Sequence, residues 1–276
     1  MGGPVSMIIW ADLHTHTTCS DGSMTPTELI RHAKKLGLHG LSITDHDTID
    51  SYSEAIEIAK KEGIHLGTGI ELSCEFNGHS LHILGYDFDP FNDRILQLCQ
   101  RHHRRREDRN LAMLEKLHQH QMPISYEELL AKARGNTIGR PHIAEIMMEK
   151  GYVKTIRDAF NLHIGEYGNC YVQGEPFSVQ EAIDILHGAH GKAFIAHPQL
   201  LPKQLPLDDL LQHPFDGMEC FYSRLTKRSW IAIAEQKRWL MSGGSDFHGS
   251  VKPEVVLGCN GVDRDTFYRI FEHPVA

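Results

Sequence analysis

The feature that most constrains this chain is a histidine-rich strand end near its start, Asp12-Leu13-His14-Thr15-His16. Side chains at alternate positions of a strand point to the same side, so the imidazoles of His14 and His16 face one point. In a parallel barrel that point lies at the carboxyl edge, where such folds place their active sites. Two histidines at this spacing are as often ordinary core or surface residues as they are metal ligands. The motif therefore needs support from the rest of the chain.

Four further predicted strand ends carry the same residue types. Each places a His, Asp or Glu where a loop begins: Thr44-Asp45-His46-Asp47, Gly69-Ile70-Glu71-Leu72-Ser73, Ile195-Ala196-His197-Pro198 and Gly244-Ser245-Asp246-Phe247-His248-Gly249. Asp246 and His248 repeat the alternate spacing of His14 and His16. Imidazole and carboxylate donors without thiolates are typical of hydrolytic zinc, manganese or iron centres, and this number of donors predicts more than one ion.

Strand and helix signals alternate before about residue 90 and again after residue 172, as in βα units around a parallel sheet or barrel. Between them the strand signal disappears and amphipathic helical segments follow one another. We therefore predict an α/β barrel formed by 1–100 and 173–276, with a helical insertion at 101–172. The expected strands are 7–13, 40–44, 65–72, 80–86, 192–196, 217–221 and one ending at Gly244; the expected helices include 25–36, 50–63, 125–133, 140–150, 155–163 and 227–238.

Charge divides the chain in the same way. The whole chain has a net charge of −8 and 20 histidines, but residues 101–172 carry +3, which leaves −11 for the remainder. An acidic body with a basic insertion indicates metal cations in the body and an anionic substrate that meets the insertion.

Several classes of protein are excluded by composition. No apolar run approaches the roughly 20 residues of a membrane span, and residues 1–12 lack the basic region of a secretion signal, so we expect a cytoplasmic protein that needs neither a membrane nor an obligate protein partner. The six cysteines form no C-x-x-C pair, which predicts reduced thiols instead of a disulfide framework or a thiolate zinc site. G-x-x-x-x-G-K-[ST], G-x-G-x-x-G, G-x-S-x-G and H-E-x-x-H are all missing.

Taken together, D-L-H-T-H-T…S-D-G, T-D-H-D, G-I-E-L-S, A-H-P and G-S-D-F-H resemble the PHP (polymerase and histidinol phosphatase) family of metallophosphoesterases. The resemblance runs essentially from end to end. The helical insertion, with G-R-P-H and G-N-C-Y-V-Q, is similar to the branch that contains bacterial 3′,5′-nucleotide bisphosphate phosphatases and a 5′-3′ exoribonuclease.

This resemblance implies a distorted (β/α)7 barrel of the PHP type with three metal ions at its mouth. By motif, the first ion would be held by His14, His16, Glu71 and Asp246; the second by Glu71, His82 and His197; and the third by Asp21, His46 and His248. His82 is preferred to its neighbour His79 because it begins the His-Ile-Leu-Gly-Tyr segment that matches the family.

The expected cofactors are two to three divalent ions, with manganese preferred and zinc or iron as alternatives. Such ions bind phosphate oxygens and lower the pKa of a bound water, so no protein nucleophile is required. We expect Asp45 and Asp47 to orient ligand imidazoles. Asp12 either does the same or is a structural group at the base of the barrel.

The insertion is expected to bind the substrate. Arg140 and His142 resemble cap positions that face the metals in the family, although an arginine near a helix start is also an ordinary exposed residue. The run Arg101-His102-His103-Arg104-Arg105-Arg106 has two interpretations, a solvated helix face or a track for an RNA backbone. Where near relatives often follow Ala-His-Pro with Gly-Arg-Tyr, this chain has Gln199-Leu200-Leu201 and so lacks that basic residue. By loop position, Arg224 and Lys227 are the candidates to replace it.

The predicted function is metal-dependent hydrolysis of phosphate esters of nucleotides or short RNA. The preferred substrates are 5′-phosphorylated oligoribonucleotides, shortened from the 5′ end, and 3′,5′-bisphosphonucleotides. Three alternatives stay open: a histidinol-phosphate or other small-molecule phosphatase, a C–N hydrolase of the amidohydrolase type, and a non-catalytic metal-binding regulatory module. The complete ligand set argues against the last, and S-D-G with T-D-H argues against the second.

Overall fold

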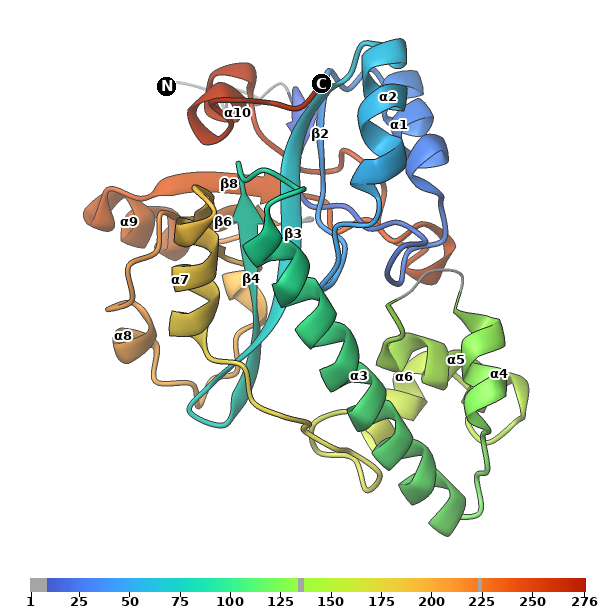
Figure 1. Ribbon diagram of the computed structural model, residues 1–276. Coiled ribbons are helices and arrows are strands. Elements are labelled where there is room, and N and C mark those ends of the chain that lie inside the picture. Colours follow the sequence, from blue (N-terminus) through green and yellow to red (C-terminus); the bar gives the residue numbers. More distant parts are fainter. Residues whose placement is uncertain (1–8, 134–136, 223–224) are drawn as a thin grey trace, which may run out of the picture.

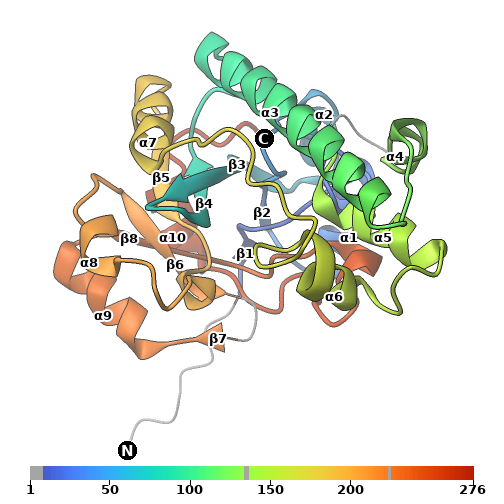
Figure 2. The same ribbon diagram turned by 90° about the horizontal axis from the view of Figure 1, so that it is seen from below.

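A barrel-like sheet lies at the centre of the molecule (Figure 1, Figure 2), in a computed structural model that describes residues 9–133, 137–222 and 225–276. Within these residues, strands β1 to β7 pair in chain order and β8 pairs with β6. The strands are β1 (Ala11–Asp12), β2 (Gly40–Ile43), β3 (His65–Phe76), β4 (His79–Tyr86), β5 (Lys192–Ile195), β6 (Gly217–Tyr222), β7 (Leu225–Thr226) and β8 (Leu240–Gly244). Met7 and Ile8, at the start of the predicted first strand, lie outside the described residues.

The barrel nearly closes because β8 returns beside β1. Leu13 N donates to Gly243 O at 3.2 Å, and Asp246 N donates to His14 O at 2.9 Å. The short β7 pairs only with β6, at Phe221 and Tyr222, and stands outside the ring. The structure therefore confirms the predicted distorted seven-stranded α/β barrel.

The direction of β4 departs from that of a regular parallel barrel. This strand pairs antiparallel with both β3 and β5, whereas β1–β2, β2–β3, β5–β6 and β6–β8 are parallel pairs. Asn77 (φ 49°) and Gly78 (φ 80°) form the two-residue turn between β3 and β4, the Asn-Gly sequence that two consecutive positive φ angles favour. As a result, the first half of β4 lies at the carboxyl edge of its neighbours.

Helices surround the barrel and begin where their caps predict. Thr25 and Glu28 form the expected capping box of α1, with Pro26 in its first turn. The second helix begins one residue later than expected, since its N-cap is Ser51 and not Asp50. The helices outside the insertion are α1 (Pro26–Lys35), α2 (Tyr52–Glu62), α7 (Val179–Gly188), α8 (Leu207–Leu210), α9 (Arg228–Lys237) and α10 (Arg264–Ile270), with short turns η2 (Pro198–Leu200) and η3 (Gly249–Val251).

The insertion, which we call the cap, is a group of helices with its own apolar core. It contains most of the long helix α3 (Asp93–Gln119), together with α4 (Tyr126–Lys132), α5 (Arg140–Glu149), α6 (Ile156–Ala159) and η1 (Phe160–Ile164). Figure 1 shows α3 running from the barrel to these helices. Ile95 and Leu98 of α3 pack in the barrel core, and Met113 and Leu117 pack in the cap core. The predicted boundary at residue 100 thus falls inside α3, and the division into domains stays a prediction.

The described helices include none that combines the length and the apolarity of a membrane span. All six cysteines are free, and Cys74, Cys170 and Cys220 are buried.

Candidate metal centre and substrate cleft

The strand ends converge on the buried carboxylate of Glu71, in the middle of β3. His46, which follows β2, forms a parallel bridge with Glu71. His82 of β4 reaches the same place from the opposite direction because β4 is antiparallel and Ser73 is its partner in the ladder. The nine predicted ligand residues are all gathered here, with Glu71 1 % exposed at their centre.

The first group contains the two histidines of the opening motif. Nε2 of His14 and Nε2 of His16 lie 3.3 and 3.2 Å from Oε2 of Glu71. The same two nitrogens lie 3.5 and 3.3 Å from Oδ1 of Asp246. All four ligand atoms fall within 4.8 Å of one another, as the alternate spacing predicts.

The second group lies on the other oxygen of Glu71. Its Oε1 is 2.8 Å from Nδ1 of His82 and 2.9 Å from Nε2 of His197, and these two nitrogens are 3.2 Å apart. Glu71 therefore presents one oxygen to each group, which is the bridging position that the family resemblance implies.

The third group is centred on Asp21, which lies in the loop after β1. Oδ1 of Asp21 lies 3.2 Å from Nε2 of His248, and Oδ2 lies 3.7 Å from Nε2 of His46. His16 joins this group as well, with Nδ1 3.7 Å from Asp21. His46 also lies near Glu71 and His82, so the three groups share members instead of forming separate sets.

The unpaired atoms of these side chains fit divalent cations. Nε2 of His14, Nε2 of His16, Nδ1 of His46 and Oε2 of Glu71 are buried and have no hydrogen-bond partner among the described residues. They face one another at 3.2 to 3.3 Å without hydrogen-bond geometry, as donors around a common point do. A buried polar atom without a partner costs roughly 1–3 kcal/mol, so a cation at that point would relieve several such costs.

Electrostatics favour positive charge at the same place. Burial alone would raise the pKa of Glu71, but the imidazoles of His46, His82 and His14 outweigh it and hold that pKa well below its usual range. Burial opposes protonation of His16, yet the carboxylates of Asp246 and Glu71 beside its Nε2 raise its pKa to about 9. A site that stabilises a proton on a buried imidazole also stabilises a metal ion.

Three residues of the site have left-handed backbone conformations. The φ angles are 26° at His197, 59° at Asp246 and 57° at Asp47. Each is held by a hydrogen bond from its own backbone N–H: to Glu219 Oε2 for His197, to His14 O for Asp246 and to Glu71 O for Asp47. Such positions cost about 1–3 kcal/mol each and are typical of functional sites.

Three supporting residues were not predicted from the sequence. Glu219, fully buried in β6, lies 2.9 Å from Nδ1 of His14. Tyr222 OH and Lys252 Nζ both donate to Oδ2 of Asp246 at 2.8 Å. An acidic residue inside the apolar strand segment Met218 to Phe221 was the available signal for Glu219, whereas no local pattern marks Lys252.

The expectation that Asp45 and Asp47 orient ligand imidazoles was wrong. Asp45 accepts from Thr17 N at 2.7 Å, from Thr17 Oγ1 at 2.6 Å and from Ser20 Oγ at 2.7 Å, and so fixes the loop that carries Asp21. Asp47 accepts from Arg106 Nε at 2.6 Å and from Ser73 N at 2.7 Å, which ties β3 to the cap. Glu219, which is not one of the predicted ligands, is instead the carboxylate that binds the outer nitrogen of the His14 imidazole.

Asp12 has the structural role that was one of its two predicted alternatives. Its carboxylate accepts the backbone N–H groups of His14 at 3.2 Å, Ser245 at 2.9 Å and Gly258 at 2.8 Å, which fastens β8 to β1. Burial raises its pKa to about 6.

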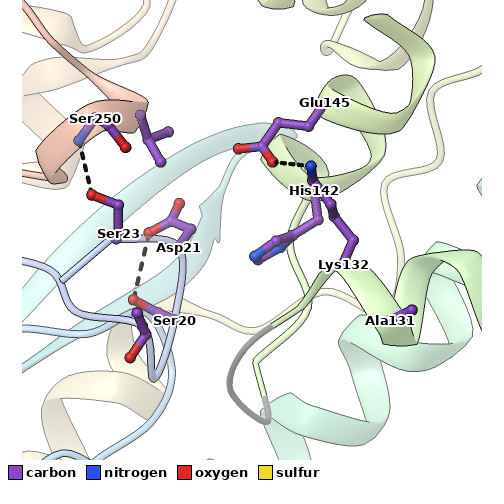
Figure 3. Close-up of a pocket in the computed structure, with 11 residues that line it drawn as sticks. Ser20, Asp21, Ser23, Ala131, Lys132, His142, Glu145 and Ser250 are labelled. Carbon is purple, nitrogen blue, oxygen red and sulfur yellow. Dashed lines mark hydrogen bonds and ion pairs between the residues drawn. The ribbon is translucent and has the colours of Figure 1, made fainter. Parts of the chain in front are cut away.

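Two pockets flank the candidate metal centre, and the two predicted substrate residues lie in different ones. His142 lines a cavity of about 350 Å³ beside Asp21, which we call the serine pocket after Ser20, Ser23 and Ser250. Figure 3 shows the imidazole of His142 and the carboxylate of Asp21 directed into it from the cap and the barrel. Arg140 lines the other, the basic pocket, whose wall includes His82 and three arginines of α3: Arg105, Arg106 and Arg109.

Neither interpretation of the arginine run describes all of it. His103 and Arg104 are exposed, as a solvated face requires. Arg101 and Arg105 lie over the ring of Phe177, and Arg106 pairs with Asp47, so these side chains point to the protein. The inward side of α3 therefore supplies the basic pocket.

Leu200 stands at the usual basic position after Ala-His-Pro, is exposed and takes no charge to the site, and its neighbour Gln199 points to the backbone of β6. Gln199 Nε2 donates to Cys220 O at 3.2 Å. Lys227 is exposed and lines neither pocket, and Arg224 lies outside the described residues. Arg106 and Arg109 are the cations that stand beside Arg140 instead.

A barrel with clustered imidazoles and carboxylates at the carboxyl edge of its strands defines a metal-dependent hydrolase. Comparison with known proteins makes the assignment specific. The PHP domain matches residues 12–193. The chain is 35 % identical to a 5′-3′ exoribonuclease from Haemophilus influenzae, over 86 % of this chain and 89 % of that protein. It is 30 % identical to a 3′,5′-nucleoside bisphosphate phosphatase from Chromobacterium violaceum, over 86 % of each.

A solved structure supports the same conclusion. A candidate metal-dependent phosphoesterase from Bifidobacterium adolescentis is 34 % identical and superimposes with a TM-score of 0.84 over 94 % of both chains. The chain belongs to the PHP family, and it is a metal-dependent phosphoesterase of that family. The family and the enzyme class inferred from the motifs are thereby confirmed.

Proposed function

We propose that this enzyme hydrolyses phosphate esters of nucleotides or short RNA. Its substrates are 5′-phosphorylated oligoribonucleotides, which it shortens from the 5′ end, and 3′,5′-bisphosphonucleotides. The observation that carries the proposal is the position of the Glu71-centred ligand cluster between two pockets, one of which is basic and shares His82 with the cluster. Relatives with both activities support it.

Two to three divalent ions are the proposed cofactors, held by the three overlapping groups described above. Nitrogen and carboxylate donors accept manganese, zinc or iron, and manganese is the ion we propose. When bound, such ions polarise a phosphoryl oxygen and lower the pKa of water towards about 7. Glu71, Asp21 and Asp246 contribute the negative charge that the cations require, because each keeps a pKa well below its usual range despite burial.

The chain's own residues then position the substrate. Gly139 N donates to Nδ1 of His142 at 3.0 Å, so the neutral imidazole carries its proton on Nε2 and can donate into the serine pocket. Burial lowers the pKa of His142, which keeps it neutral. Arg140 presents a planar guanidinium that suits two phosphate oxygens in the basic pocket. Asp45 is saturated by the donors of the Thr17–Ser20 loop and is not available as a general base.

One pocket arrangement serves both substrates. A phosphate that is not cleaved binds on the cap side, and the neighbouring ester lies at the ligand cluster. A bisphosphonucleotide is then the shortest member of the series of 5′-phosphorylated chains. We also propose a cytoplasmic location, which fits free thiols and a nucleotide substrate.

The test is a mass-resolved time course with manganese-loaded protein and a short RNA that carries a 5′-monophosphate. We expect stepwise release of nucleoside monophosphates from the 5′ end. If the RNA stays intact while metal analysis shows filled sites, the exonuclease activity is wrong, and hydrolysis of a bisphosphonucleotide or of histidinol phosphate decides between the remaining substrates.

A further inference from the structure

The carboxylate of Asp246 uses its two oxygens for different contacts. Oδ1 lies 3.5 Å from Nε2 of His14 and 3.3 Å from Nε2 of His16, and so faces the first ligand group. Oδ2 accepts two hydrogen bonds, one from Tyr222 OH and one from Lys252 Nζ, each 2.8 Å long. One of these donors is neutral and the other is charged, so their roles can be separated.

Tyr222 already fixes the orientation of Asp246. It is buried at the end of β6, and its ring lies 5.5 Å from the ring of His197, so the barrel wall holds its hydroxyl in place. Burial and the neighbouring Asp246 raise the pKa of Tyr222, and the hydroxyl therefore keeps the proton that it donates. A neutral donor of this kind orients a ligand without adding charge to it.

Lys252 adds a positive charge that orientation does not require. It follows η3, and its side chain is 38 % exposed, unlike that of Asp246. Among the ion pairs of the described residues, it is the one lysine or arginine that contacts a carboxylate of the three ligand groups. Partial burial opposes its charge, but Asp246, Asp21 and Glu71 raise its pKa, so the ammonium group stays protonated within electrostatic reach of all three groups.

For metal binding this charge is a disadvantage. A lysine on Oδ2 of Asp246 repels a divalent cation at Oδ1 and offsets part of the negative charge that binds the cation. The loop after β5 brings no charge to the cluster, and the arginines of the basic pocket approach it from the cap, at His82. Lys252 is thus the cation that the described part of the barrel places at the first group, where an anion would gain from it.

We propose that Lys252 is a catalytic residue of this phosphoesterase: its ammonium group donates a hydrogen bond to a non-bridging oxygen of the scissile phosphate, while Tyr222 holds Asp246 in place. An ammonium group carries three donors, and Asp246 is its one acceptor among the described residues, so donors remain for a phosphate. Cations placed at the phosphoryl oxygens stabilise the transition state of phosphoryl transfer. The inference rests on the proposed function for the substrate used to test it.

Metal binding distinguishes a catalytic lysine from one that only supports a ligand. Manganese is titrated into metal-free wild type, Lys252→Met and Tyr222→Phe, with calorimetric detection. We expect Lys252→Met to bind manganese about 3- to 10-fold more tightly, because a repulsive charge is removed. Tyr222→Phe should bind it about 10-fold more weakly, because Asp246 loses the donor that orients it. If Lys252→Met instead loses affinity as Tyr222→Phe does, Lys252 only supports the metal site and the proposal is overturned.

Turnover of a 3′,5′-bisphosphonucleotide is then compared in proteins that metal analysis shows to hold the same number of ions. We expect Lys252→Met to lower kcat about 100-fold with a smaller effect on KM, as for a contact that strengthens in the transition state. Lys252→Arg keeps the charge and should recover part of the loss. Lys227→Met removes an exposed lysine and is expected to match the wild type. An unchanged kcat in Lys252→Met with filled metal sites overturns the proposal.

A binding measurement separates this proposal from the proposed substrate. Inorganic phosphate should raise the Tm of manganese-loaded wild type by more than it raises that of manganese-loaded Lys252→Met. If the wild type shows this difference but hydrolyses neither a bisphosphonucleotide nor 5′-phosphorylated RNA, the contact of Lys252 with phosphate stands and the proposed substrate is wrong. If the bisphosphonucleotide is hydrolysed and Lys252→Met matches the wild type in both kcat and phosphate shift, the proposed function stands and the role of Lys252 is wrong.

Discussion

Oε1 of Glu219 lies 2.9 Å from Nδ1 of His14, and both side chains are fully buried. Because Glu219 is a carboxylate, Nδ1 of His14 is the donor of this bond, and Nε2 is left to face Glu71 and Asp246. The other oxygen of Glu219 accepts the backbone N–H of His197 at 2.7 Å. One acidic residue of β6 therefore fixes a member of the first group and a member of the second.

Replacing Glu219 should weaken metal binding without removing a ligand. We expect Glu219→Gln to lower manganese affinity about 10- to 100-fold, because the charge that orients and strengthens the His14 imidazole is lost. Titration calorimetry on the metal-free protein measures this. Glu235→Gln, an exposed acid on α9, is the matched control. Equal affinities in Glu219→Gln and wild type would show that the contact is only structural.

The choice between two histidines of β4 is testable by counting ions. His82→Asn should lose one metal ion per chain, measured by mass spectrometry after removal of unbound metal, because Nδ1 of His82 is one of the two imidazole nitrogens beside Oε1 of Glu71. His79→Asn should keep the wild-type number, since His79 pairs with Phe76 at the far end of the hairpin. The reverse result would assign the second site to His79.

His102 predicts a dependence of stability on pH. It is buried, and burial lowers its pKa to about 4; Arg105 also donates to its Nδ1 at 2.8 Å, which requires the neutral ring. The unfolded chain takes up a proton near pH 6.5 that the folded chain takes up only near pH 4, so stability falls between these values as the pH is lowered. The difference between the two pKa values contributes about 3 kcal/mol to the free energy of unfolding, and this contribution is fully present above pH 7.

The measurement is the free energy of unfolding from pH 7 to pH 4, with wild type, His102→Asn and the exposed neighbour variant His103→Asn. The loss of stability should be smaller in His102→Asn by the amount above, while His103→Asn follows the wild type. Parallel curves for all three proteins would mean that His102 takes up its proton at the same pH in the folded and the unfolded chain.

The ion pair between Arg106 and Asp47 should be costly to break. The side chain of Asp47 is 1 % exposed, so Arg106→Met leaves the buried carboxylate of Asp47 without its main partner. We expect this variant to lose about 3 kcal/mol of the free energy of unfolding. Arg101→Met, from a pair whose two side chains are each 39 % exposed, should cost less than about 1 kcal/mol. Urea unfolding compares them, and similar losses for the two variants would contradict the distinction.

The convergence of the candidate ligands could be predicted from the sequence because strand ends are local signals. Each of the strand-end motifs brought at least one His, Asp or Glu to the cluster around Glu71, since parallel strands share one carboxyl edge. His82 reached the site through the antiparallel β4, and the Asn77-Gly78 turn was a local signal for that direction.

What could not be predicted were contacts between distant segments. Asp47 pairs with Arg106, which lies 59 positions later in the sequence, and no periodicity in either segment indicates this pairing. Glu219 likewise meets His14 205 positions away. The pairing that decides whether an arginine is solvated, neutralised or available to a ligand is therefore a property of the folded chain.

The antiparallel β4 also has a consequence for the order of assembly. Glu71 and His82 lie on one hairpin, so their side of the cluster forms from contacts that close a short loop. The first group instead requires β8 to meet β1, a contact fastened by the bond between Asp12 and Ser245 across 233 positions. High-affinity metal binding at the first group thus requires closure of the barrel, so metal uptake there during refolding would report that β8 has met β1.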